Sequence, residues 1–124
     1  MVRIIGIVMA ATTALAPAAA HAADWWWVAG EPGSQEAWFV DTDTIEGNGA
    51  QLSFDLLHIE AGREAGDPEG RQVDCDRASP DPVQRFVCAT PEQRLSMGAM
   101  LGPMAPDVAA TAIFQAAPVE TARR

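Results

Sequence analysis

The chain has 124 residues and a mass of 13.1 kDa, which limits it to one small domain. Its 17 acidic and 8 basic residues give a formal net charge of -9, and every basic residue is Arg. This negative charge repels phosphate groups, so it excludes nucleic-acid binding driven by charge and disfavours binding to an anionic bilayer.

The first 22 residues have the pattern of a secretory signal peptide. Arg3 supplies the basic start, and the apolar run Ile4–Leu15 has the length of a signal-peptide core but is too short to span a bilayer. The small residues Ala20 and Ala22 predict cleavage after Ala22, with the run 18–20 as the second choice. An uncleaved N-terminal anchor is the alternative. We expect an exported chain, periplasmic or secreted, without a membrane anchor.

Residues 23–117 are expected to form one α+β domain, in which a small antiparallel β-sheet carries one C-terminal α-helix packed on a face. Residues 118–124 would form a flexible tail. The run Gly47-Asn48-Gly49 predicts a tight chain reversal. Three strands are predicted in the first half of the domain, at residues 24–28, 37–41 and 51–60.

Side chains alternate in character along the third of these strands. Leu52, Phe54, Leu56 and His58 share one face. We expect this to be the core face, because the opposite face begins with two polar residues. An exposed loop is expected over residues 61–70, which are rich in Gly and charged residues.

The second half is predicted to contain further strands and the helix. The strands would lie at residues 72–75, 85–88 and 94–101. Asp107 is the expected N-cap of a helix that runs to Ala117, where Pro118 ends it. An apolar stripe would place this helix on the sheet, and it consists of Val108, Ala109, Ala112, Ile113 and Ala116.

Cys75 and Cys88 are the only cysteines, and an even count in an exported chain predicts a disulfide. Each lies in a predicted strand, and the turn signal at 79–82 would place the two sulfurs opposite each other. A zinc site or two free thiols are the alternatives. Zinc needs further ligands, and His58 is the only His after the signal peptide.

The catalytic motifs in the sequence are incomplete. The run 41–43 opens like a calcium loop, but oxygen ligands are missing at the later positions. His58-Ile59-Glu60 matches the start of the zinc-deaminase motif, but the Cys pair that this motif requires is absent. We therefore predict no catalytic residue, no cofactor and no metal site. An enzyme centred on His58 is the least supported alternative.

Aromatic side chains are the candidate contact residues. In a strand, Trp26 points away from its two Trp neighbours, so it either packs beneath the C-terminal helix or contacts a partner. Trp38 and His58 are the other possible partner contacts. A small-molecule carrier that uses a concave sheet face near Trp38, Phe54 and His58 is an alternative to protein binding.

A series of short motifs follows the predicted signal peptide. These motifs are Asp24-Trp25, the strand end at 38–45, a Gly-Asn-Gly reversal, Val73-Asp74-Cys75 and a Pro-rich approach to a final helix. In this order they resemble the surface-adhesin protein E family. The resemblance implies an antiparallel sheet with a C-terminal helix on one face, and the binding of host or matrix proteins that some members of the family show. The family usually has its second cysteine at the end of the last helix, whereas residues 115–117 here are Gln-Ala-Ala.

The sequence thus predicts an exported, non-enzymatic binding domain that resembles surface-adhesin protein E. Its partner would be a protein or another component of the cell envelope. The carrier and the enzyme centred on His58 are the two alternatives.

Overall fold

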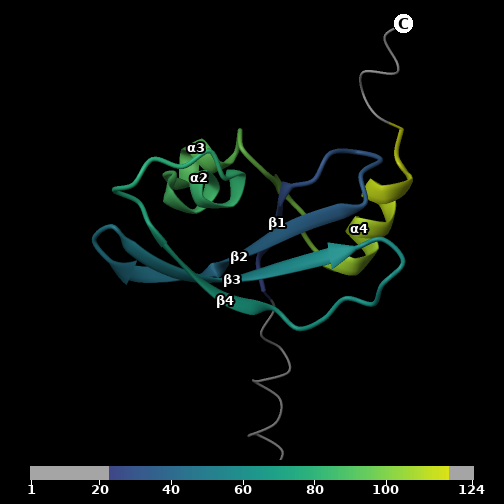
Figure 1. The fold of residues 1–124 in the computed structure, drawn as a ribbon, viewed down its shortest axis with the longest axis horizontal. Coiled ribbons are helices and arrows are strands. Elements are labelled where there is room, and N and C mark those ends of the chain that lie inside the picture. The colour runs from purple at the N-terminus through teal and green to yellow at the C-terminus, as the bar shows by residue number, and fades with distance from the viewer. Residues whose placement is uncertain (1–22, 118–124) are drawn as a thin grey trace, which may run out of the picture.

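The computed structural model describes residues 23–117, which form a five-stranded antiparallel β-sheet with short helices packed against it (Figure 1). The predicted α+β class is confirmed. The predicted signal peptide and the predicted tail at 118–124 lie outside the described residues. The strand order is β4-β3-β2-β1-β5. The elements are β1 (Trp25–Ala29), β2 (Glu36–Asn48), β3 (Gln51–Glu60), β4 (Glu69–Asp74), α2 (Pro82–Cys88), α3 (Pro91–Arg94), β5 (Ala99–Met100) and α4 (Pro106–Gln115).

The hairpin of β2 and β3 forms the centre of the sheet. Its strands are joined by Gly49 and Ala50, because Asn48 pairs with Gln51. Gly49 has φ +63°, which fits the first central position of a type II′ turn and favours glycine there. The reversal predicted from the Gly-Asn-Gly run is confirmed.

Successive side chains of β2 and β3 enter two separate cores. On one face, sheet residues such as Val40 and Leu56 pack with Phe86 of α2. On the other face, Phe39 and Leu57 pack with α4. The prediction of a single core face was therefore wrong, because α4 covers the face that begins with two polar residues. In Figure 1, α2 lies toward the β2–β3 turn and α4 toward the opposite end of the strands.

The Trp-rich strand β1 also divides its side chains between these cores. Trp26 is 6% exposed and its ring centroid lies 5.5 Å from that of Phe86. Trp25 and Trp27 pack against the core beneath α4. Trp26 thus packs beneath a helix, but the helix is α2 and not the C-terminal one that the sequence suggested.

Helix α2 replaces the strand predicted at 85–88. Asp81 is its N-cap and accepts a hydrogen bond from the Val83 backbone N–H at 3.1 Å, and Pro82 occupies the first turn. These start signals favour a helix locally, and its apolar face is buried with Phe86 in the core. Tertiary burial therefore outweighs the strand preference of the Phe-Val pair.

The strand predicted at 94–101 is also corrected, because most of that segment is not extended. Thr90 and Gln93 form a capping box that starts α3, and only Ala99–Met100 pairs with β1. Arg94 ends α3 and its guanidinium donates to the backbone carbonyls of Phe86 at 3.1 Å and Val87 at 2.8 Å. Burial lowers the pKa of Arg94.

The C-terminal helix α4 matches the prediction within two residues at each end. It begins at Pro106 after the N-cap Ala105, two residues earlier than predicted, so Asp107 lies in the first turn and is not the N-cap. Its residues Ala109, Ala110 and Ile113 are buried against the sheet. The predicted apolar stripe was therefore right for Ala109 and Ile113 and wrong for Val108, Ala112 and Ala116, which are exposed. None of the helices within residues 23–117 is long and apolar enough to cross a membrane.

The predicted disulfide between Cys75 and Cys88 is confirmed, with a Cα–Cα distance of 5.6 Å. Its predicted setting between two strands was wrong. Cys75 directly follows β4, whereas Cys88 is the last residue of α2, so the bond joins an outer strand to a helix. A disulfide of this kind is typical of oxidising compartments outside the cytoplasm.

Removing the disulfide should destabilise the domain. The bond closes a loop with a sequence separation of 13, and a loop of this size contributes about 3 kcal/mol in the chain-entropy model. We expect the Cys75→Ala/Cys88→Ala variant to lose about this much free energy of unfolding, measured by urea denaturation at equilibrium. A loss below about 0.5 kcal/mol would show that the bond does not constrain the unfolded chain.

Arg94→Ala should also destabilise the domain, because it removes two charge-assisted hydrogen bonds to the C-terminal end of α2. We expect a loss of about 2 kcal/mol in urea denaturation. Arg77→Ala is the matched control, because the Arg77 side chain is 82% exposed. The control should change stability by less than about 0.5 kcal/mol, and equal losses in both variants would refute the role given to Arg94.

Candidate functional site

The sheet face beneath α2 continues past the helix, toward the end of β2 and β3 opposite their turn. Two cross-strand pairs lie there on the same face as Val40: Trp38 opposite His58, and Glu36 opposite Glu60. Trp38 is half-buried and packs against the core beneath α2, whereas His58 is exposed. We call Glu36, Trp38, His58 and Glu60 the open patch.

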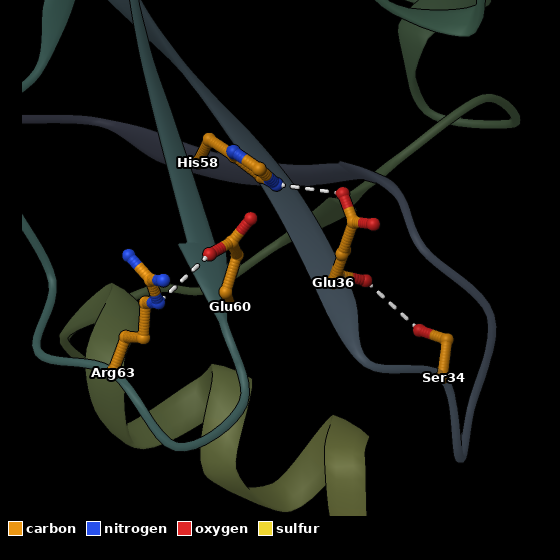
Figure 2. Close-up of polar contacts among 5 residues, drawn as sticks. All are labelled: Ser34, Glu36, His58, Glu60 and Arg63. Atoms are coloured by element: carbon orange, nitrogen blue, oxygen red, sulfur yellow. Dashed lines mark hydrogen bonds and ion pairs between the residues drawn. The ribbon is translucent and has the colours of Figure 1, made fainter.

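The side chains of the open patch contact one another. The rings of Trp38 and His58 are stacked, with centroids 4.5 Å apart and planes inclined by 8°. His58 Nε2 lies 2.9 Å from Glu36 Oε1. Figure 2 shows Glu60 beside this pair, on the same strand as His58, with one of its oxygens 3.4 Å from Arg63 Nε. The open patch thus combines an aromatic surface with two carboxylates.

The two carboxylates leave the open patch with an excess of negative charge. Glu36 and Glu60 are directly opposite in the antiparallel register, where like charges destabilise a sheet. Arg63 is the cation paired with Glu60, and its side chain is 76% exposed. A pair this exposed contributes little, so the patch retains an attraction for a cation.

A small hollow adjoins the open patch beneath the start of α2. Its volume is about 240 Å³, and its lining includes Trp38, Leu56, Arg71 and Val83 but not His58. Pockets that enclose small molecules usually measure about 300–1,000 Å³. The hollow is therefore too small to enclose most ligands, although Trp38 forms part of its wall.

Larger open depressions lie elsewhere on the surface. One, of about 580 Å³, borders the disulfide and Gln93. Another, of about 490 Å³, lies between α4 and the loop that contains Arg63. A further one, of about 450 Å³, lies beside the end of β1 and residues 95–99. None of these includes Trp26, Trp38 or His58, the contact residues predicted from the sequence.

The structure brings together only some of the residues predicted for the site. Trp38 and His58 are in contact, as the carrier hypothesis requires. Trp26 and Phe54 are buried in the core beneath α2, so neither contributes to the exposed surface beside His58. The concave face predicted from Trp38, Phe54 and His58 is thus not a continuous surface, because α2 covers Phe54.

Sequence reasoning missed Glu36, Glu60 and their place beside His58. Their spacing from Trp38 and His58 does put them on the same face, because side chains two apart in a strand point the same way. The pairing across the strands was not predictable, because β2 contains an irregularity. Between Asp41 and Glu46 it has four residues, where β3 has one between Ser53 and Asp55.

Polar side chains hold this irregularity in place. The buried carboxylate of Asp41 accepts hydrogen bonds from the backbone N–H groups of Asp24 at 2.9 Å and Asp43 at 3.1 Å. Thr44 accepts from the Asp55 backbone N–H at 2.8 Å and donates to the Asp41 carbonyl at 2.7 Å. The run 41–43, whose first residues resemble the start of a calcium loop, therefore stabilises the irregularity in β2.

The open patch does not contain the arrangement of a Ser-His-acid hydrolase. Figure 2 shows Ser34 near Glu36, but the Ser34 hydroxyl donates to the Glu36 main-chain carbonyl at 2.8 Å and not to His58. His58 instead contacts the Glu36 carboxylate and the Trp38 ring. Its neighbours suit recognition of a cation better than activation of a hydroxyl nucleophile.

Comparisons of this chain with protein-family models, with curated proteins and with solved structures found no match. The resemblance to the surface-adhesin protein E family therefore stays a prediction.

The stacked pair of Trp38 and His58 should show a measurable energetic coupling. We expect a double-mutant cycle with Trp38→Ala and His58→Ala to give about 0.5–1.5 kcal/mol of interaction free energy in urea denaturation. A cycle of Trp38→Ala with Thr111→Ala on α4 is the control and should be additive. If both cycles are additive, the stacking does not stabilise the patch.

Proposed function

We propose that this chain is an exported, non-catalytic binding domain that contacts its partner through the open patch. The observation that carries the proposal is the half-buried Trp38 stacked on the exposed His58 beside two carboxylates. The disulfide supports a site of action outside the cytoplasm. With cleavage after Ala22, this place would be the periplasm or the cell exterior, as the sequence predicts.

The chemistry of the open patch favours a partner with a basic surface. A guanidinium or ammonium group can lie on an aromatic ring and at the same time pair with a carboxylate. Trp is also frequent at the energetically dominant positions of protein interfaces. The net charge of -9 would steer a positively charged protein or envelope component toward the domain.

The resemblance to surface-adhesin protein E is consistent with a partner that is a host or matrix protein. The resemblance transfers no contact residue to this chain. The proposed contacts therefore come from the open patch itself, with Trp38, His58 and the carboxylates of Glu36 and Glu60 facing the partner.

The carrier hypothesis is the second candidate, and it has weaker support. It requires an enclosed pocket beneath the helix into which His58 points. The hollow beside Trp38 measures about 240 Å³, and His58 is not among its lining residues. A flat aromatic and acidic surface of this kind suits a protein contact better than an enclosed small molecule.

Site-specific photo-crosslinking in the native cell tests the proposed contact surface. A photoreactive residue in place of His58 should give a discrete crosslinked product, and the same residue at Thr111 on α4 should not. Glu60→Lys in the crosslinking chain should reduce the product several-fold, because it reverses the charge that a basic partner requires. Equal products from both positions, or a product unaffected by Glu60→Lys, would contradict the proposal.

A further inference from the structure

We propose that Glu36, His58 and Glu60 bind one divalent transition-metal ion, with zinc as the ion that their donor atoms suit. This proposal does not rest on the proposed partner binding. An ion bound here would occupy the same carboxylates, so zinc and a basic partner would compete for the open patch. The three side chains come from two adjacent strands and share one sheet face. One ligand atom from each lies within 4.8 Å of the others.

Small side-chain movements would bring the three ligand atoms to the distances that a bound metal ion requires. Zinc bonds of about 2.0–2.2 Å in tetrahedral geometry place two ligand atoms about 3.4 Å apart. His58 Nε2 and Glu36 Oε1 are now 2.9 Å apart, and the whole set spans no more than 4.8 Å. Three protein ligands would leave the fourth position of the ion for water.

The kind of donor selects the class of metal. Two carboxylates alone would suit calcium or magnesium, which prefer oxygen ligands. The imidazole nitrogen of His58 adds a donor that favours zinc and neighbouring transition metals over these ions. The cysteines cannot take part, because both are in the disulfide.

Trp38, which is not itself a ligand, would hold one ligand of the proposed site in place. Its ring stacks on His58 at 4.5 Å with an inclination of 8°, so it fixes the plane in which the imidazole nitrogen points. Side chains on paired strands, supported by packing, hold ligand geometry better than side chains on loops. Trp38 acts here as a positioning residue.

The charges of the cluster also point to a cation. Glu36 and Glu60 face each other across the strands, and an ion between them would remove their repulsion. The ion would compete with Arg63, which lies 3.4 Å from Glu60 and is 76% exposed. Releasing such an exposed side chain costs little, so Arg63 weakens metal binding without preventing it.

Titration of the untagged, disulfide-bonded protein with zinc chloride tests the site. We expect one zinc ion per chain, and Glu36→Gln and His58→Gln should each reduce the affinity at least tenfold. Glu46→Gln is the matched control, because it removes the same charge from β2 beyond the irregularity. Circular dichroism verifies that the variants, all at exposed positions, stay folded.

Three further readouts decide the outcome. Zinc should shift the ring resonances of His58 in NMR spectra, magnesium and calcium should not compete at equal concentration, and Arg63→Gln should bind zinc more tightly. The proposal is overturned if zinc does not bind, if His58→Gln binds as the wild type does, or if magnesium competes equally. Weaker zinc binding by Arg63→Gln would contradict it as well.

Discussion

The pairing of β2 with β3 is the constraint on which the rest of the structure depends. Because alternate side chains of the two strands enter opposite cores, this one hairpin supplies the apolar surface for both α2 and α4. Phe39 and Val40 are adjacent in the chain and both fully buried, yet they belong to different cores. Each such side chain contributes about 1.5–3 kcal/mol when it is buried. The helices are therefore secondary to the hairpin, and their positions decide which parts of its faces stay open.

The open patch follows from a difference in length. Helix α2 has seven residues and is about 10 Å long, whereas the 13 residues of β2 extend over about 40 Å. A helix this short covers only part of the strand, and its disulfide ties it to the end of β4. The sheet face beyond it carries Trp38, His58 and the two carboxylates. Exposure of these residues thus results from the architecture.

The sequence predicted the elements better than their contacts. Alternation and turn residues were enough for β3, the reversal and the first part of β2, which was predicted at 37–41 but continues to Asn48. The cysteine count was enough for the disulfide, and an apolar stripe before Pro118 was enough to predict α4. Helix α2 was missed because Phe-Val is typical of strands, and only the cap at Asp81-Pro82 indicates otherwise. The pairing of Trp38 with His58 depends on the irregularity in β2, and extrapolation from the turn would have placed a different residue opposite Trp38. The contact between Trp38 and His58 could therefore be identified only from the three-dimensional structure.

The two edge strands of the sheet, β4 and β5, limit how this domain can associate with other chains. At one edge, β4 carries Glu69 and Arg71, whose side chains are 61% and 48% exposed and form an ion pair at 2.9 Å. At the other, β5 offers only two residues for hydrogen bonding. Edge strands that are charged or very short disfavour pairing with strands of other chains. The two edges of this sheet therefore disfavour its growth by strand addition and amyloid-like stacking.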